Sequence, residues 1–124
     1  MSGSGSLTKL NTGTLVLTGA NSYSGGSTVI GGILQGTTIS LQGNIVNNAN
    51  VTFDQSTAGT YAGVMSGTGS LTKSGTGTVI LSGANSYTGG TTVDGGTLQG
   101  TASSIQGDIS NNANVTFDQA TAGI

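Results

Sequence analysis

Hydrophobic and polar residues alternate in this chain over short stretches. In TLVLTG, Leu15 and Leu17 point to one side of an extended chain and Val16 points to the other. In NVTFD, Phe53 shares one side with Val51, and the threonine between them takes the opposite side. Gly, Asn and Ser interrupt these stretches at about every four to eight residues. No stretch has apolar residues at helical spacing, so the pattern predicts an all-β protein.

The chain consists of two copies of one unit. Residues 2–60 align without a gap with residues 66–124, and about 42 of the 59 residue pairs are identical. We divide the chain into a first unit, 1–65, and a truncated second unit, 66–124, which together form one continuous solenoid fragment. A linker conserves composition rather than register, so this repetition argues against simple disorder.

Strand and turn lengths favour one all-β architecture over another. Strands of about 4–6 residues joined by turns of about 2–4 give about twenty residues for a coil of three strands. The 64-residue unit therefore predicts a parallel β-helix with about three coils per repeat. A β-sandwich needs longer strands and more large side chains than a chain with 4% aromatic residues supplies. In a β-helix, stacked Leu, Val and Ile fill the narrow interior.

Two groups of residues are expected to build this solenoid. The predicted core rows consist of Leu15, Leu17, Val79, Leu81, Phe53 and Phe117. With three coils per unit, Leu17 and Leu81 should occupy equivalent places three coils apart, as should the two phenylalanines. Asparagines in turns or in amide ladders between coils are predicted at Asn21, Asn85, Asn50 and Asn114. The alternative for these asparagines is contact with glycans.

One segment resembles a known family almost residue for residue. LTKSGTGTVILSGANSYTGGTTVDGGTLQG (71–100) is similar to the autotransporter-associated β-strand repeat, also called the passenger-associated transport repeat. The corresponding segment 7–36 departs from it at positions such as Leu10, Asn11 and Ile33. The resemblance covers about half of the chain. It implies a right-handed parallel β-helix in the passenger of a Gram-negative protein that is secreted or displayed on the cell surface, anchored in the outer membrane. It implies a stalk or scaffold and no defined activity.

Composition excludes several classes of protein. Only 5% of the residues are charged, the net charge is −2, and the two cations, Lys9 and Lys73, form no basic patch, so we expect no nucleic-acid partner. Cysteine is absent, which rules out a disulfide or a thiolate site. No signal peptide begins the chain, and the targeting segments of a secreted parent would lie outside this fragment.

The candidate chemistry is sparse. Asp54 and Asp118 are equivalent acids expected about 15 Å apart along a solenoid, too far for the ~5–9.5 Å of a glycosidase pair. Asp94 and Asp108 do not recur in both units, and the nonapeptide signature of calcium-binding solenoids is missing. Lys9 and Lys73 are interpreted as charges that protect a strand from aggregation. We therefore expect no enzyme, no catalytic or metal-binding residue and no cofactor.

The leading hypothesis is a structural repeat module, the stalk of a cell-surface adhesin. One alternative is a filament subunit, in which chains stack head to tail through unpaired coil ends. Another is a direct adhesin surface that binds glycans or proteins of a host or a neighbouring cell.

Overall fold

The computed structural model describes residues 2–3, 6–17, 22–23, 26–41, 43–83, 85–100, 105, 109–111 and 113–117. These residues form short strands joined by turns. The described ranges contain no helix, and hence none that could cross a membrane. The all-β prediction is confirmed.

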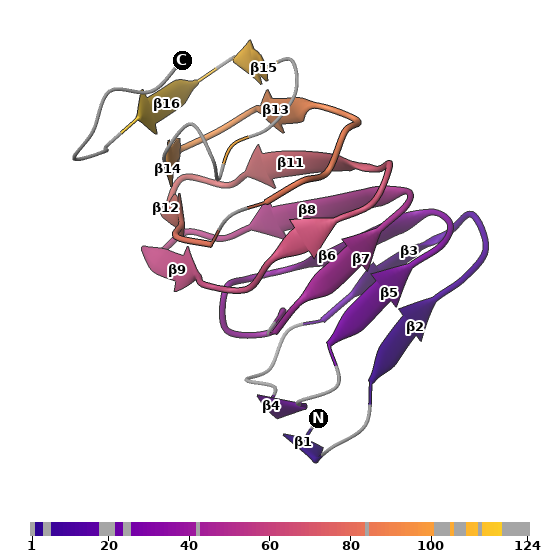
Figure 1. Ribbon diagram of the computed structural model, residues 1–124. Coiled ribbons are helices and arrows are strands. Elements are labelled where there is room, and N and C mark those ends of the chain that lie inside the picture. Colours follow the sequence, from indigo (N-terminus) through magenta and orange to yellow (C-terminus); the bar gives the residue numbers. More distant parts are fainter. Residues whose placement is uncertain are drawn as a thin grey trace.

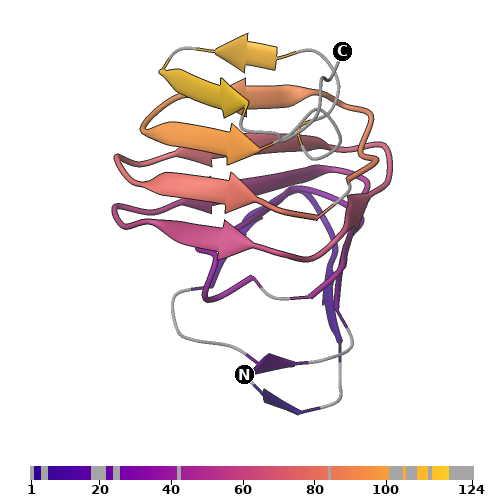
Figure 2. The ribbon, with the colours of Figure 1, turned by 60° about the vertical axis from the view of Figure 1, so that its left-hand side comes forward.

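The strands stack in parallel into a β-solenoid of about 5 turns (Figure 1). Face I contains β2 (Leu7–Lys9), β5 (Ser27–Val29), β7 (Ile45–Asn47) and β10 (Met65–Ser66). Face II contains β3 (Thr14–Val16), β6 (Ile33–Gly36), β8 (Asn50–Asp54), β11 (Ser70–Ser74), β13 (Thr91–Val93) and β15 (Ile109–Asn111). Face III, toward the viewer in Figure 2, contains β9 (Gly59–Tyr61), β12 (Thr78–Leu81), β14 (Thr97–Gly100) and β16 (Asn114–Phe117). A separate pair consists of β1 (Ser2–Gly3) and β4 (Ser22–Tyr23).

Alternation along each strand separates the interior from the surface. On face II, Leu34, Val51 and Leu71 stack in register and are fully buried. Thr72, beside Leu71, stacks on Thr52 on the outer side of the same strands. Full burial of a Leu or Val side chain contributes about 1.5–3 kcal/mol, so these inward rows supply most of the driving force for stacking the coils.

The coil length varies along the stack. The coil that leads from Leu7 to its register partner Ser27 is slightly longer than the next one, which leads from Ser27 to Ile45. Ser27 stacks below Ile45, and Ile45 stacks below Met65. The Ser86 N–H donates to the Met65 carbonyl, which places Asn85 above Met65, three coils from Ser27. The residue equivalent to Ser27 in the second unit is Thr91, which lies beyond Asn85 by about the length of one strand and its turn. One unit therefore makes three coils and about a third of a fourth.

This extra third rotates the second unit by one face. The LTK strand of the first unit, β2, lies on face I, while its equivalent β11 lies on face II. In the same way β3 on face II corresponds to β12 on face III, and β8 on face II corresponds to β16 on face III. The expectation that Leu17 and Leu81 occupy one place three coils apart was wrong, because the unit is not a whole number of coils long.

Candidate functional site

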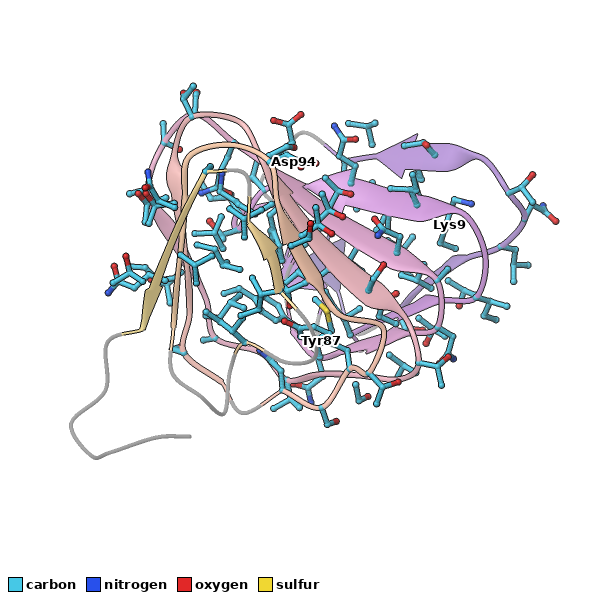
Figure 3. All side chains as sticks on the ribbon, turned by 90° about the horizontal axis from the view of Figure 1, so that it is seen from above. Lys9, Tyr87 and Asp94 are labelled. Carbon is cyan, nitrogen blue, oxygen red and sulfur yellow. The ribbon has the colours of Figure 1, made fainter. Side chains whose placement is uncertain are left out.

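The two acidic residues that the structure describes, Asp54 and Asp94, lie on the outer edge of face II. Asp54 ends β8, is exposed, and accepts a hydrogen bond of 3.2 Å from the Gln35 side-chain amide. Ser74 stacks on Asp54, and the exposed Asp94, which is labelled in Figure 3, follows in the next coil. The Asp94 N–H donates to the Lys73 carbonyl. Within the described ranges, no group of three or more His, Cys, Asp or Glu residues could hold a metal ion. Asp108 and Asp118 lie outside the described residues.

The two lysines form the most specific polar arrangement in the described structure. The Lys73 ammonium donates to the carbonyls of Ser74 at 2.6 Å, Gly75 at 3.2 Å and Gly95 at 3.2 Å. Its first two acceptors lie at the end of β11 and in the turn that follows, and the third belongs to the turn one coil above. We call this arrangement a lysine clamp, because one ammonium binds the backbone of two successive coils.

The first unit builds the same clamp. The Lys9 ammonium donates to the carbonyls of Leu10 at 2.5 Å, Asn11 at 3.1 Å and Gly31 at 3.2 Å. The two clamps therefore match atom for atom, although β2 and β11 lie on different faces. Hydrogen bonds from a charged donor are about twice as strong as neutral ones, so each clamp ties two coils together.

The geometry of the clamp explains why glycine occupies positions 75 and 96. Gly96, directly after the acceptor Gly95, has φ of 63°, and an added Cβ would clash with the Gly77 carbonyl oxygen and lie 2.9 Å from the Lys73 ammonium nitrogen. Gly75 has φ of 79°, and Asn11, at the equivalent position, has φ of 68°. Asn is the residue that adopts this left-handed region most readily after Gly, which explains why Asn can replace Gly here.

Both lysines are buried, which argues against their interpretation as charges that protect a strand from aggregation. Lys73 is 0% exposed and Lys9 is 7% exposed. Burial lowers the pKa of Lys73 from its ordinary value, and the Asp54 carboxylate raises it in part. The sequence did hold a signal for this burial, since Leu71 and Lys73 are two residues apart on one strand and so share its inward side.

The asparagines predicted in turns or ladders have these positions. Asn85 is buried, and its side-chain oxygen accepts the Met65 N–H at 2.8 Å. Asn50 donates to the Ser70 hydroxyl at 2.7 Å in the coil above. Asn114 begins β16 and is exposed, and Asn21 lies outside the described residues.

The same interpretation as a turn or ladder residue applies to Asn47, which recurs as Asn111 in the second unit and is buried at the end of β7 on face I. It donates to the Ser70 carbonyl at 2.8 Å, and its side-chain oxygen accepts the Ala49 N–H at 3.1 Å. Its burial follows from the alternation along β7, because Asn47 lies two residues after the buried Ile45 on the same strand.

The predicted core residues are unevenly buried. Val79, Leu81 and Phe53 are buried, and Phe53 contacts Tyr61 with ring centroids 5.4 Å apart. Leu15 and Leu17 are half-buried and pack against the core. Phe117 ends β16, where it pairs with Gly100, and its side chain lies outside the described part of the structure.

Comparison with known proteins gives two findings. Residues 7–35 and 71–99 match the passenger-associated-transport-repeat family. The adhesin BmaC autotransporter of Brucella suis biovar 1 (strain 1330) is 42% identical over 152 aligned positions, which cover 97% of this chain. The chain spans 4% of the length of that relative. No solved structure matches the chain.

Proposed function

Because this chain belongs to the passenger-associated-transport-repeat family, we propose that it is a scaffold module in the stalk of a secreted cell-surface passenger. The parent protein is anchored in the outer membrane of a Gram-negative cell, and the module holds a binding region away from that membrane. The relative's name describes an adhesin autotransporter, which supports an adhesive rather than an enzymatic parent.

The observation that carries this proposal is the hydrogen bonding of the buried polar groups. Among the described residues, no buried side-chain nitrogen or oxygen lacks a hydrogen-bond partner. Many of these bonds join successive coils, as at Lys73 with Gly95, Asn50 with Ser70, and Gln55 with the Thr38 N–H at 2.8 Å. The polar residues are thus engaged in holding the stack together, as a stalk that resists pulling requires.

The proposal is tested in the intact parent passenger on cells. Removal of one 64-residue unit in frame should leave surface display and adhesion intact and shorten the distance from membrane to ligand. The isolated chain, added in excess, should not compete for adhesion. Competition by the isolated chain would contradict the stalk and support a direct binding surface.

A direct adhesin surface has one supporting observation. Thr72 and Thr92 stack in register on the outer side of face II and are half-buried, whereas Thr52 below them is only 9% exposed and its hydroxyl donates to the Asn50 side chain. The partly accessible hydroxyl groups of Thr72 and Thr92 suit hydrogen bonding to a glycan of a host or neighbouring cell. Binding on a glycan array that is lost when Thr72→Val is introduced would support this alternative.

Head-to-tail self-association also has one supporting observation. Ile109 pairs with Thr91 and is 36% exposed, whereas Thr91 is 2% exposed. A further coil, from the same parent or from another copy, would cover Ile109. Analytical ultracentrifugation over a wide concentration range tests whether another copy of the chain supplies this coil. A single monomeric species would contradict such association.

A further inference from the structure

Each segment that matches the family contains two turns that are bonded to each other across neighbouring coils. The first, which we call the lysine turn, directly follows the strand of the clamp lysine and comprises residues 10–13 in the first unit and 75–77 in the second. The second, which we call the glycine turn, lies one coil above and comprises residues 30–32 and 94–96. Both turns lie within the matched residues, so the family segment carries the two turns together.

Three hydrogen bonds connect the two turns in the second unit. The Asp94 N–H donates to the Lys73 carbonyl at 2.8 Å, and the Thr97 N–H donates to the Gly77 carbonyl at 3.1 Å. The Lys73 ammonium provides the third bond, to the Gly95 carbonyl at 3.2 Å. Its other two acceptors lie in its own coil, and the coil beneath contributes only the longer-range attraction of a carboxylate. The hydrogen bonds of the ammonium therefore tie its coil to the one above and not to the one below.

The first unit makes the same three bonds without a coil beneath them in the part of the chain that the structure describes. Its lysine strand, β2, is the outermost strand of face I and pairs only with β5 above it. An added Cβ at Gly13 would meet nothing within 4 Å, whereas at Gly77, its equivalent, it would clash with the coil beneath. The bonds run from the Ile30 N–H to the Lys9 carbonyl (2.8 Å), from the Ile33 N–H to the Gly13 carbonyl (3.0 Å) and from the Lys9 ammonium to the Gly31 carbonyl (3.2 Å).

The close fit of the two turns also specifies the register of the upper coil. An added Cβ at Gly95 would lie 2.7 Å from the Gly75 carbonyl oxygen, and one at Gly96 would clash with the Gly77 carbonyl oxygen. A slip by one residue in either direction would bring Asp94 or a threonine into one of these two places, where no side chain fits. Such a slip would also turn the inward side chains of that coil toward solvent.

From these contacts we infer that the lysine turn is a one-way register latch, which fixes the register of the coil above it. The glycine turn depends on the lysine turn and its strand for three hydrogen bonds. In the opposite direction, the ammonium keeps two of its three acceptors when the upper coil opens, and water replaces the third. Opening of the lower turn therefore releases the upper one, whereas opening of the upper turn leaves the lower one formed. The latch operates whether or not the module is a stalk.

The experiment measures amide hydrogen exchange of the full chain by NMR, for the wild type and for Lys73→Met. The Asp94 and Thr97 N–H groups report on the connection between the turns, because both donate across it. The Gly77 N–H donates to the Gln55 carbonyl at 2.9 Å and so reports on the contact with the coil beneath.

Leu71→Val provides the matched control. Leu71 is fully buried on the strand that carries Lys73, and it pairs with Val51 beneath and with Thr91 above. Shortening its side chain should speed the exchange of all three reporter amides to a similar degree. The control thus distinguishes a general loss of stability from the loss of the latch.

We expect Lys73→Met to speed the exchange of Asp94 and Thr97 about tenfold and to leave Gly77 close to its wild-type rate. Equal acceleration of the three amides, or no acceleration, would overturn the inference.

Should Lys73→Met fail to fold, Lys9→Met tests the same latch in the first unit. The reporters are then the Ile30 and Ile33 N–H groups, which donate to the strand and turn of Lys9. Their exchange should accelerate while that of Gly77, several coils away, stays unchanged. Unaltered exchange at Ile30 and Ile33 would equally overturn the inference.

Discussion

The Lys73 clamp and the Lys9 clamp have the same sequence motif and the same hydrogen bonds, yet their surroundings differ. Lys73 pairs with Phe53 below and Val93 above, and it is 0% exposed. Lys9 pairs with Val29 and is 7% exposed. The sequence motif therefore determines the hydrogen bonds of the clamp. The strands stacked on either side determine how deeply the clamp is buried and which side chains its positions can accommodate.

The same contrast holds for the residue two positions after each lysine. An added Cβ at Gly75 would lie 2.5 Å from the Gln55 carbonyl oxygen. Asn11, its equivalent, is exposed and tolerates a side chain with φ of 68°. Substitutions at equivalent positions should consequently have unequal effects, and the following predictions test that inequality.

The largest difference is expected between Leu81 and Leu17. Leu81 is 1% exposed, so Leu81→Ala should lower the free energy of unfolding by about 2–5 kcal/mol. Leu17 is half-buried, and Leu17→Ala should cost clearly less. Urea denaturation followed by circular dichroism measures both, with Thr78→Ala as a control that should be nearly neutral. Equal losses at the two leucines would show that both units are packed alike.

The glycine of the clamp provides the second difference. Gly75→Asn places a Cβ against the Gln55 carbonyl and should destabilise the protein by about 1–3 kcal/mol. The reverse change in the other unit, Asn11→Gly, removes a side chain from a left-handed position and should stabilise or be neutral, within about 1 kcal/mol. Thermal unfolding of both variants checks the signs. A loss of stability with Asn11→Gly would mean that its side chain serves the clamp.

Removal of the ammonium groups gives the third difference. Lys73→Met leaves three carbonyls around a buried site without their donor, and an unsatisfied buried polar group costs about 1–3 kcal/mol. Part of that loss is offset, because the variant no longer buries a charge. Lys9→Met should lose less, since water reaches its clamp more readily. A larger loss at Lys9 would contradict the link between burial and constraint. Chemical denaturation of the two single variants and the double variant measures these effects.

The alternation of apolar and polar residues predicted which side chains face inward, and hence the all-β solenoid. It could do so because successive side chains of a strand point to opposite faces. The rotation between units could not be predicted in this way. Register offsets vary from coil to coil, and the coil from Ile33 to Asn50 is shorter than the coil from Asn50 to Ser70. A small error in the assumed number of residues per coil therefore adds up, over one unit, to a displacement by one whole strand. Turn geometry sets these offsets, and no single residue marks it.

The lysine clamp was missed for a different reason. Lysine is almost never fully buried unless it is paired, and here its partners are backbone carbonyls, which every residue has. The acceptors Ser74, Gly75 and Gly95 carry no side-chain chemistry that would identify them in the sequence. The glycine pair at 95–96 was visible, but its purpose depends on the proximity of two turns in neighbouring coils.

The smallest expected effect is a pH dependence that belongs to Lys73. Burial lowers the pKa of Lys73 in the folded protein, so folding disfavours its charged form. The resulting cost is fully present below the lowered pKa and is relieved as the pH rises from that value toward the pKa of the unfolded chain. The Asp54 carboxylate raises the pKa of Lys73 in part and so offsets some of this cost.

The measurement is the difference in free energy of unfolding between the wild type and Lys73→Met, taken from neutral pH to strongly alkaline pH. The absolute stability also reflects Tyr61 and Tyr87, which are buried and whose hydroxyl groups ionise in the unfolded chain near pH ~10. Because both proteins contain these tyrosines, their contribution cancels in the difference. The wild type should gain on the variant as the pH rises. A difference that shrinks with pH would mean that the three carbonyls stabilise the ammonium more than burial destabilises it, and that the Lys73 clamp is a net attraction for the charge.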